Sequence, residues 1–65
     1  MQTVYRDDDY HVYTVWGSVN VHNAHTGRIA TCNSARLWLD RLHREDKRAV
    51  AETLYMESVN ANPST

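Results

Sequence analysis

The sequence predicts an α+β fold, a small antiparallel sheet of two or three strands packed against one or two C-terminal helices. Residues 10–21 are rich in valine, tyrosine, threonine and tryptophan and lack helical spacing, which is typical of strands. After Ser34 the apolar residues recur at helical intervals. We expect residues 1–59 to form one domain and residues 60–65 a flexible tail, because Pro63 and its small polar neighbours do not propagate a helix.

The expected strands occupy the first half of the chain. Residues 10–21 favour strand, with Gly17 either bending one strand or separating two. Residues 23–27 predict a turn in which Gly27 takes a positive φ, and residues 28–32 a returning strand. Residues 3–5 are a candidate for a further short strand before the acidic turn that follows.

The second half of the chain changes period. Asn33 and Ser34 are suitable N-cap residues for a first helix. The apolar spacing lapses over residues 43–46, where a helix either kinks or ends. Glu45 and Asp46 favour a new N-terminus, so we expect a second helix from about Asp46 to Ser58. The face of the first helix is formed by Ala35, Trp38, Leu39 and Leu42.

Composition limits the range of functions. A chain of 65 residues has room for one small domain, and its single cysteine excludes an internal disulfide framework and a four-cysteine zinc site. The longest apolar run is too short to span a bilayer, and residues 1–10 carry three aspartates and no apolar stretch typical of a secretory signal. We therefore expect a cytoplasmic protein that does not bind a membrane.

The histidines and the cysteine suggest two possible reactive sites, a zinc site and a nucleophile with its base. His22, His25, Cys32 and His43 carry zinc-binding side chains, but their spacing matches no known zinc pattern. Cys32 with His22 or His43 could form a nucleophile and base pair, although so small a domain lacks an obvious cleft and oxyanion arrangement. We expect no metal, no cofactor and no enzymatic activity.

The aromatic residues favour protein binding. The chain has no phenylalanine but four tyrosines and two tryptophans, which are enriched at interfaces. We expect Trp38 in the core and predict partner contacts at Tyr10, Tyr13, Trp16 and Tyr55. Asp7, Asp8 and Asp9 are either a solvated turn or an acidic patch for a basic partner.

Self-association is a further possibility. A core this small contributes only about 3–5 kcal/mol, so a partner or a second copy would help to stabilise it. The second helix is the candidate homodimer surface, because its apolar residues spread over more than one narrow stripe. These residues are Val50, Leu54, Tyr55, Met56 and Val59.

Nucleic-acid binding is the alternative function. Arg41, Arg44, Lys47 and Arg48 could contact phosphates, because the three arginines are spaced to line one side of a helix. Against this reading, acidic residues are interleaved with them and the net charge of the chain is −1. The same residues fit a solvated helix face with charge pairs four residues apart.

The segment Cys32–Arg41 runs Asn-x-Ala-Arg-x-Trp-Leu-acidic-Arg from Asn33 and resembles the sheet-then-helix ending of short lambdoid-prophage proteins. It is also similar to the Ser-Ala-x-x-Trp helix start of the small DNA-binding cell-division activator of enterobacteria. The resemblance implies a phage or mobile-element accessory protein that binds and inhibits a host complex, such as a CRISPR effector, nuclease or polymerase. It carries over no functional residue.

Overall fold

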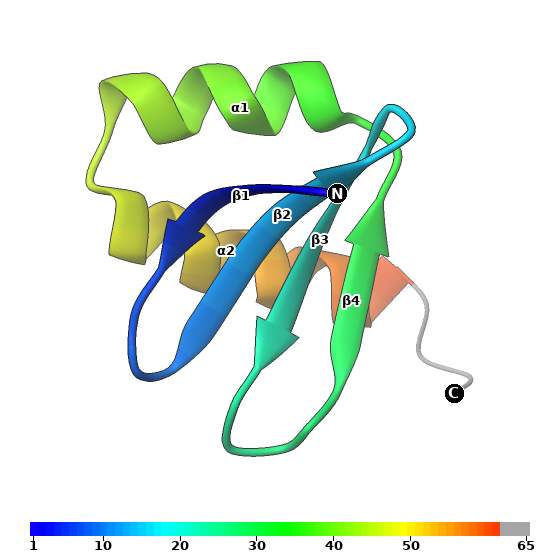
Figure 1. Cartoon of the computed structure of the whole chain (residues 1–65), viewed down its shortest axis with the longest axis vertical. Coiled ribbons are helices and arrows are strands. Elements are labelled where there is room, and N and C mark those ends of the chain that lie inside the picture. The colour runs from blue at the N-terminus through cyan, green and yellow to red at the C-terminus, as the bar shows by residue number, and fades with distance from the viewer. Residues whose placement is uncertain (62–65) are drawn as a thin grey trace.

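The computed structural model describes residues 1–61, which form a sheet backed by two helices (Figure 1). The strands are β1 (Gln2–Arg6), β2 (Tyr10–Val15), β3 (Ser18–Asn23) and β4 (Ile29–Cys32). The helices α1 (Ala35–Arg44) and α2 (Lys47–Ala61) follow them. The α+β class predicted from the change of period is therefore confirmed, with four strands instead of two or three.

The sheet is an antiparallel meander in the order β1-β2-β3-β4. Val12, Val21 and Ala30 lie opposite one another across the three last strands. Because strand side chains alternate, these residues share one face, and the helices pack on that face. The pairing of β1 with β2 shifts register between Thr3 and Tyr5, a bulge at Val4 that lets Tyr5 pack against the core.

Gly17 separates two strands. Val15 pairs with Ser18, so Trp16 and Gly17 form a two-residue hairpin loop, and both have positive φ, 48° and 82°. Positive φ at both positions is the pattern of a type I′ turn, whose twist matches that of the flanking strands. The sequence did not decide whether Gly17 bends one strand or separates two, because Trp-Gly is an unusual pair in a loop that normally holds Asn-Gly.

The predicted turn after β3 is confirmed. The Asn23 side-chain oxygen accepts hydrogen bonds from the backbone N–H groups of His25 (2.8 Å) and Thr26 (3.2 Å). The Gly27 N–H donates to the Asn23 carbonyl at 2.8 Å, and Gly27 has a φ of 74°. An asparagine side chain and a glycine thus direct the chain into β4.

The first helix lies as its apolar spacing predicts. Ala35, Trp38 and Leu42 are buried, and Leu39 packs at the margin of the core. Ser34 precedes the helix, but its side chain makes no capping hydrogen bond, and only its carbonyl accepts from Trp38 N–H at 3.3 Å.

The second helix is longer than expected. It begins after Asp46, whose side chain accepts the Arg48 N–H at 3.2 Å, in the manner of an N-cap. It continues through Asn60 and Ala61, which we assigned to the tail, because Ser58 and Val59 still pack against the core. Residues 62–65, the rest of the expected tail, lie outside the described residues.

The core-facing residues of α2 form a single stripe, so the expected second stripe for a dimer is absent from the described part of this helix. Only Met56, of the apolar residues named for a dimer contact, is largely exposed. The stripe consists of Val50, Ala51, Leu54, Tyr55 and Ser58. Within residues 1–61, neither helix has the length and apolar character needed to cross a membrane.

Candidate functional site

The most exposed large apolar side chain in the described structure belongs to Trp16. Its side chain is fully exposed (100%), at the tip of the turn between β2 and β3. A bulky residue at positive φ is unfavourable, because its Cβ crowds the following carbonyl oxygen. Neither burial nor backbone preference accounts for a tryptophan here, and residues held in strained conformations cluster at functional sites.

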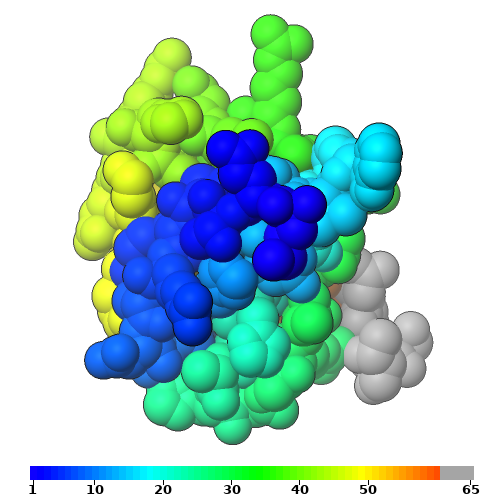
Figure 2. Space-filling view, viewed as in Figure 1, coloured from blue at the N-terminus to red at the C-terminus, as the bar shows by residue number. Residues whose placement is uncertain are grey.

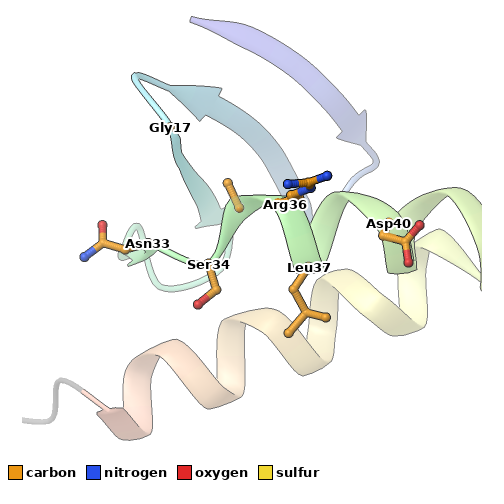
Figure 3. Close-up of a pocket in the computed structure, with 7 residues that line it drawn as sticks. Gly17, Asn33, Ser34, Arg36, Leu37 and Asp40 are labelled. Carbon is orange, nitrogen blue, oxygen red and sulfur yellow. The ribbon is translucent and has the colours of Figure 1, made fainter.

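A groove of about 750 Å³ lies beside this turn (Figure 3). Gly17 contributes one wall, and residues 33–37 with Asp40 contribute the other. In Figure 3, Arg36 and Leu37 extend to different sides of α1. Leu37 is 61% exposed. Trp16 and this groove together form the candidate contact surface, which we call the Trp16 end.

The acidic turn, which consists of Asp7, Asp8 and Asp9, is bound to side chains from other parts of the chain. Arg48, at the start of α2, donates one guanidinium N–H to Asp7 Oδ2 at 2.8 Å and another to Asp9. Asp9 also pairs with the His25 ring, which the turn between β3 and β4 supplies. Asp7 accepts the Tyr5 hydroxyl through Oδ2, and its Oδ1 accepts the N–H groups of Asp9 (2.8 Å) and Tyr10 (2.7 Å).

These contacts shift the pKa values of Asp7, Asp9 and Tyr5. The Tyr5 hydroxyl and the Tyr10 N–H donate to Asp7 and hold the pKa of its carboxyl far below the usual range. Arg48 and then His25 lower the pKa of Asp9 in the same way. The hydrogen bond to Asp7 raises the pKa of Tyr5. Two of the three predicted acidic contacts are therefore internal ion pairs, and only Asp8 is exposed.

Most of the basic residues named for nucleic-acid binding are also paired with carboxylates. We call this set, Arg41, Arg44, Lys47 and Arg48, the basic stripe. Arg41 donates two guanidinium N–H groups to Glu45 at 3.1 and 3.3 Å, and its guanidinium carbon lies 4.9 Å from the centre of the Trp38 ring. Arg44 pairs with Asp40 at 3.2 Å. With Arg48 held by the acidic turn, Lys47 is the one residue of the stripe for which the described structure shows no carboxylate partner. The prediction that the three arginines line one helix is wrong, because α1 ends at Arg44 and Arg48 lies in α2. Arg41 and Arg44 make charge pairs four residues apart, whereas Arg48 binds the acidic turn.

The four aromatic residues predicted to contact a partner differ in their exposure to solvent. Tyr55 is only 8% exposed, and its ring centre lies 5.9 Å from that of half-buried Tyr10. Tyr55 therefore belongs to the core and does not serve as the surface contact that its interface preference led us to expect. Tyr13 is half-buried on the sheet face away from the helices, and Trp16 alone is fully exposed.

The residues named for zinc binding or catalysis lie on different elements. His22 is on β3, opposite His11 of β2. His25 binds Asp9, His43 is exposed on α1, and half-buried Cys32 ends β4. Among residues 1–61 no three metal-ligating side chains form a group that could hold an ion. The sequence analysis did not identify Arg36 and Leu37 as residues that line the groove. Leu37 could have been found, because it is an apolar residue that falls outside the apolar stripe of its helix.

Comparisons with protein-family models, with curated proteins and with solved structures find no match to this chain.

Proposed function

We propose that the chain is a non-enzymatic protein-binding module that inserts Trp16 into an apolar pocket of a partner protein. The observation that carries this proposal is the complete exposure of a tryptophan held at positive φ. Tryptophan is the residue type most enriched at binding hot spots, where it fills a pocket on the partner. Leu37, exposed beside the same groove, adds apolar contact area.

The partner is a host protein complex, and the chain is a phage or mobile-element accessory protein that inhibits or modulates it. The resemblance of the segment Cys32–Arg41 to short prophage proteins supports this part of the proposal. A small rigid surface is sufficient for stoichiometric inhibition, because occupying a site on the target requires no chemistry. A CRISPR effector, a nuclease or a polymerase are the expected kinds of target.

The paired state of the basic stripe supports protein over nucleic acid as the partner. Arg41, Arg44 and Arg48 each hold a carboxylate of the chain itself. A phosphate group would have to compete with these internal carboxylates. The affinity for a nucleic acid would therefore gain less from counterion release than three unpaired arginines would provide.

The test is affinity capture from host cells with wild-type protein and two variants. Trp16→Asn removes the exposed ring and suits positive φ, whereas Met56→Ala removes an exposed apolar side chain from α2 and serves as the control. We expect a stoichiometric protein partner that survives moderate salt, is lost with Trp16→Asn and is retained with Met56→Ala. Co-purification of nucleic acid alone, lost with Arg44→Glu and at raised salt, would contradict the proposal.

A further inference from the structure

The last strand of the sheet has a neighbour on one side only. β4 stands at the end of the order β1-β2-β3-β4, so within the described chain it pairs with β3 alone. Figure 1 shows β4 at the right-hand side of the sheet, with the C-terminal part of α2 crossing behind it. In the space-filling view from the same side, the N-terminal strands cover the centre and β4 lies to their right (Figure 2). We call the outer side of β4 the free edge.

The register of β3 and β4 determines which backbone groups lie at the free edge. The Asn23 N–H donates to the Arg28 carbonyl at 2.9 Å, so the backbone of Arg28 faces β3. Along an antiparallel strand, residues that bond to the neighbour alternate with residues that face away from it. Ile29 and Thr31 therefore direct their N–H and C=O groups outward. These groups have the spacing with which another extended chain can pair.

The two edges of the sheet differ in how well they are protected. β1, the opposite edge, has the register shift between Thr3 and Tyr5 and carries Arg6. A bulge and a charged side chain hinder the addition of a further strand. β4 has the sequence Ile-Ala-Thr-Cys, without charge, proline or glycine, and its pairing with β3 has no register shift. Its first side chain, Ile29, is 52% exposed. Strand addition is therefore favoured at β4.

A depression of about 390 Å³ adjoins the free edge. In a strand added beside β4, every second side chain would point toward the helices, and so over this depression. Proteins that bind peptides by strand addition obtain affinity from main-chain hydrogen bonds and specificity from such pockets. Leu37 lines both the depression and the groove of the Trp16 end. The depression is lined by Thr31, Cys32, Asn33, Ser34, Leu37, Trp38, Glu57 and Ser58.

The charge of the depression indicates the chemistry of its occupant. Glu57 is the one charged residue among the described residues that line it. Asp40 and Glu45 are held by arginines, whereas exposed Glu57 has no ion pair within residues 1–61. The same depression presents the apolar side chains of Leu37 and Trp38. An apolar side chain with a neighbouring lysine or arginine is complementary to this combination.

We propose that the free edge binds an extended segment of a partner protein as a fifth strand, with an apolar side chain over the depression and a lysine or arginine beside Glu57. A second copy of the chain fits less well. Pairing two β4 edges about a two-fold axis would bring together the two α2 helices, each of which lies beside its own β4 in the same layer. A single strand brings no such helix. This contact is additional to that of Trp16 and does not depend on it.

The test begins with selection of peptides from a random display library on the immobilised protein. We expect enriched sequences in which β-branched or aromatic residues alternate with polar ones and which include a lysine or arginine. The enriched peptides are then synthesised with a fluorescein label and titrated by fluorescence anisotropy, with expected dissociation constants of about 1 μM to 1 mM. N-methylation of the peptide residues that face β4 removes their N–H donors and should weaken binding at least about tenfold. N-methylation of the alternate residues should leave the dissociation constant unchanged.

Two pairs of variants test the protein side. Ile29→Pro removes an outward N–H without removing a hydrogen bond to β3, and should raise the dissociation constant at least about tenfold; Ile29→Val keeps the N–H and is the control. Glu57→Lys should select peptides with aspartate or glutamate in place of the basic residue. Glu52→Lys, the same change at an exposed position of α2 outside the depression, should not. Circular dichroism identifies any variant that fails to fold, and the N-methylated peptides require no variant.

Four results would overturn the proposal. The first is a library that yields no enriched peptide, and the second is binding that survives both Ile29→Pro and N-methylation. The third is binding lost with Trp16→Asn and retained with Ile29→Pro, which would assign the peptides to the Trp16 end and leave the proposed function intact. The fourth is a wild type that dimerises in sedimentation velocity and becomes monomeric with Ile29→Pro, which would assign the free edge to a second copy.

Discussion

Replacing Trp16 by asparagine should make the protein more stable. A non-glycine residue in the left-handed region costs about 1–2 kcal/mol, and asparagine tolerates that region better than tryptophan. Trp16 is fully exposed, so removing its ring uncovers no apolar surface that would offset the gain. We expect Trp16→Asn to raise the free energy of unfolding by about 1 kcal/mol, which corresponds to a rise in Tm of roughly 4–8 °C for a domain of this size.

The assay is thermal unfolding followed by circular dichroism, with Trp16→Ala as the matched control. Alanine removes the same ring but is strained at positive φ, so its free energy of unfolding should stay within about 0.5 kcal/mol of the wild type. A lower Tm for Trp16→Asn would refute the reasoning, since the ring would then be contributing contacts. An equal rise for both variants would show that the gain does not come from the backbone. A stabilised variant that also loses the captured partner would show that Trp16 is retained for binding at a cost in stability.

Three further predictions concern the fold. Leu54→Ala should lower the free energy of unfolding by about 2–5 kcal/mol, because Leu54 is completely buried; a smaller loss in urea denaturation would contradict the core assignment. Gly27→Ala should lower it by about 1–2 kcal/mol, because alanine is strained at a φ of 74°, and an unchanged Tm would argue against that turn. The carboxyl pKa values of Asp7 and Asp9 are lower in the folded chain, so the stability that they contribute is present above their unfolded pKa near 3.9 and is lost as pH falls below it. Tm measured from pH 7 to pH 2 should therefore fall on acidification, and less steeply in Arg48→Gln than in Arg44→Gln; equal slopes would refute the role of Arg48.

The fold could be predicted from the sequence where the local pattern and the packing agree. The spacing of Ala35, Trp38 and Leu42 specified the buried face of α1, and Asn23 with Gly27 specified a turn, because each depends on neighbouring residues. The number of strands was underestimated. Trp16-Gly17 does not show the usual hairpin signal, and β1 reaches its full length only through pairing with β2.

The candidate site was only partly predictable, because charge partners are distant in the sequence. Asp7 and Arg48 are separated by 41 positions, and nothing in the local pattern shows that they form an ion pair. The exposure of Trp16 and the burial of Tyr55 are equally non-local, since both residue types occur in cores and at surfaces. Residue type therefore identified a set of candidates, and only the fold separated them.

The position of α2 in the chain determines when this protein can fold during synthesis. Val50, Ala51 and Leu54 close the core over the sheet, and Arg48 holds the acidic turn, so all of these contacts come from the last described helix. The ribosome makes the strands first, and until α2 emerges from the exit tunnel the valines of β2 and β3 have only α1 to cover them. This domain consequently completes its folding only after α2 has emerged, and nascent chains stalled before α2 should be the ones that chaperones bind and proteases remove.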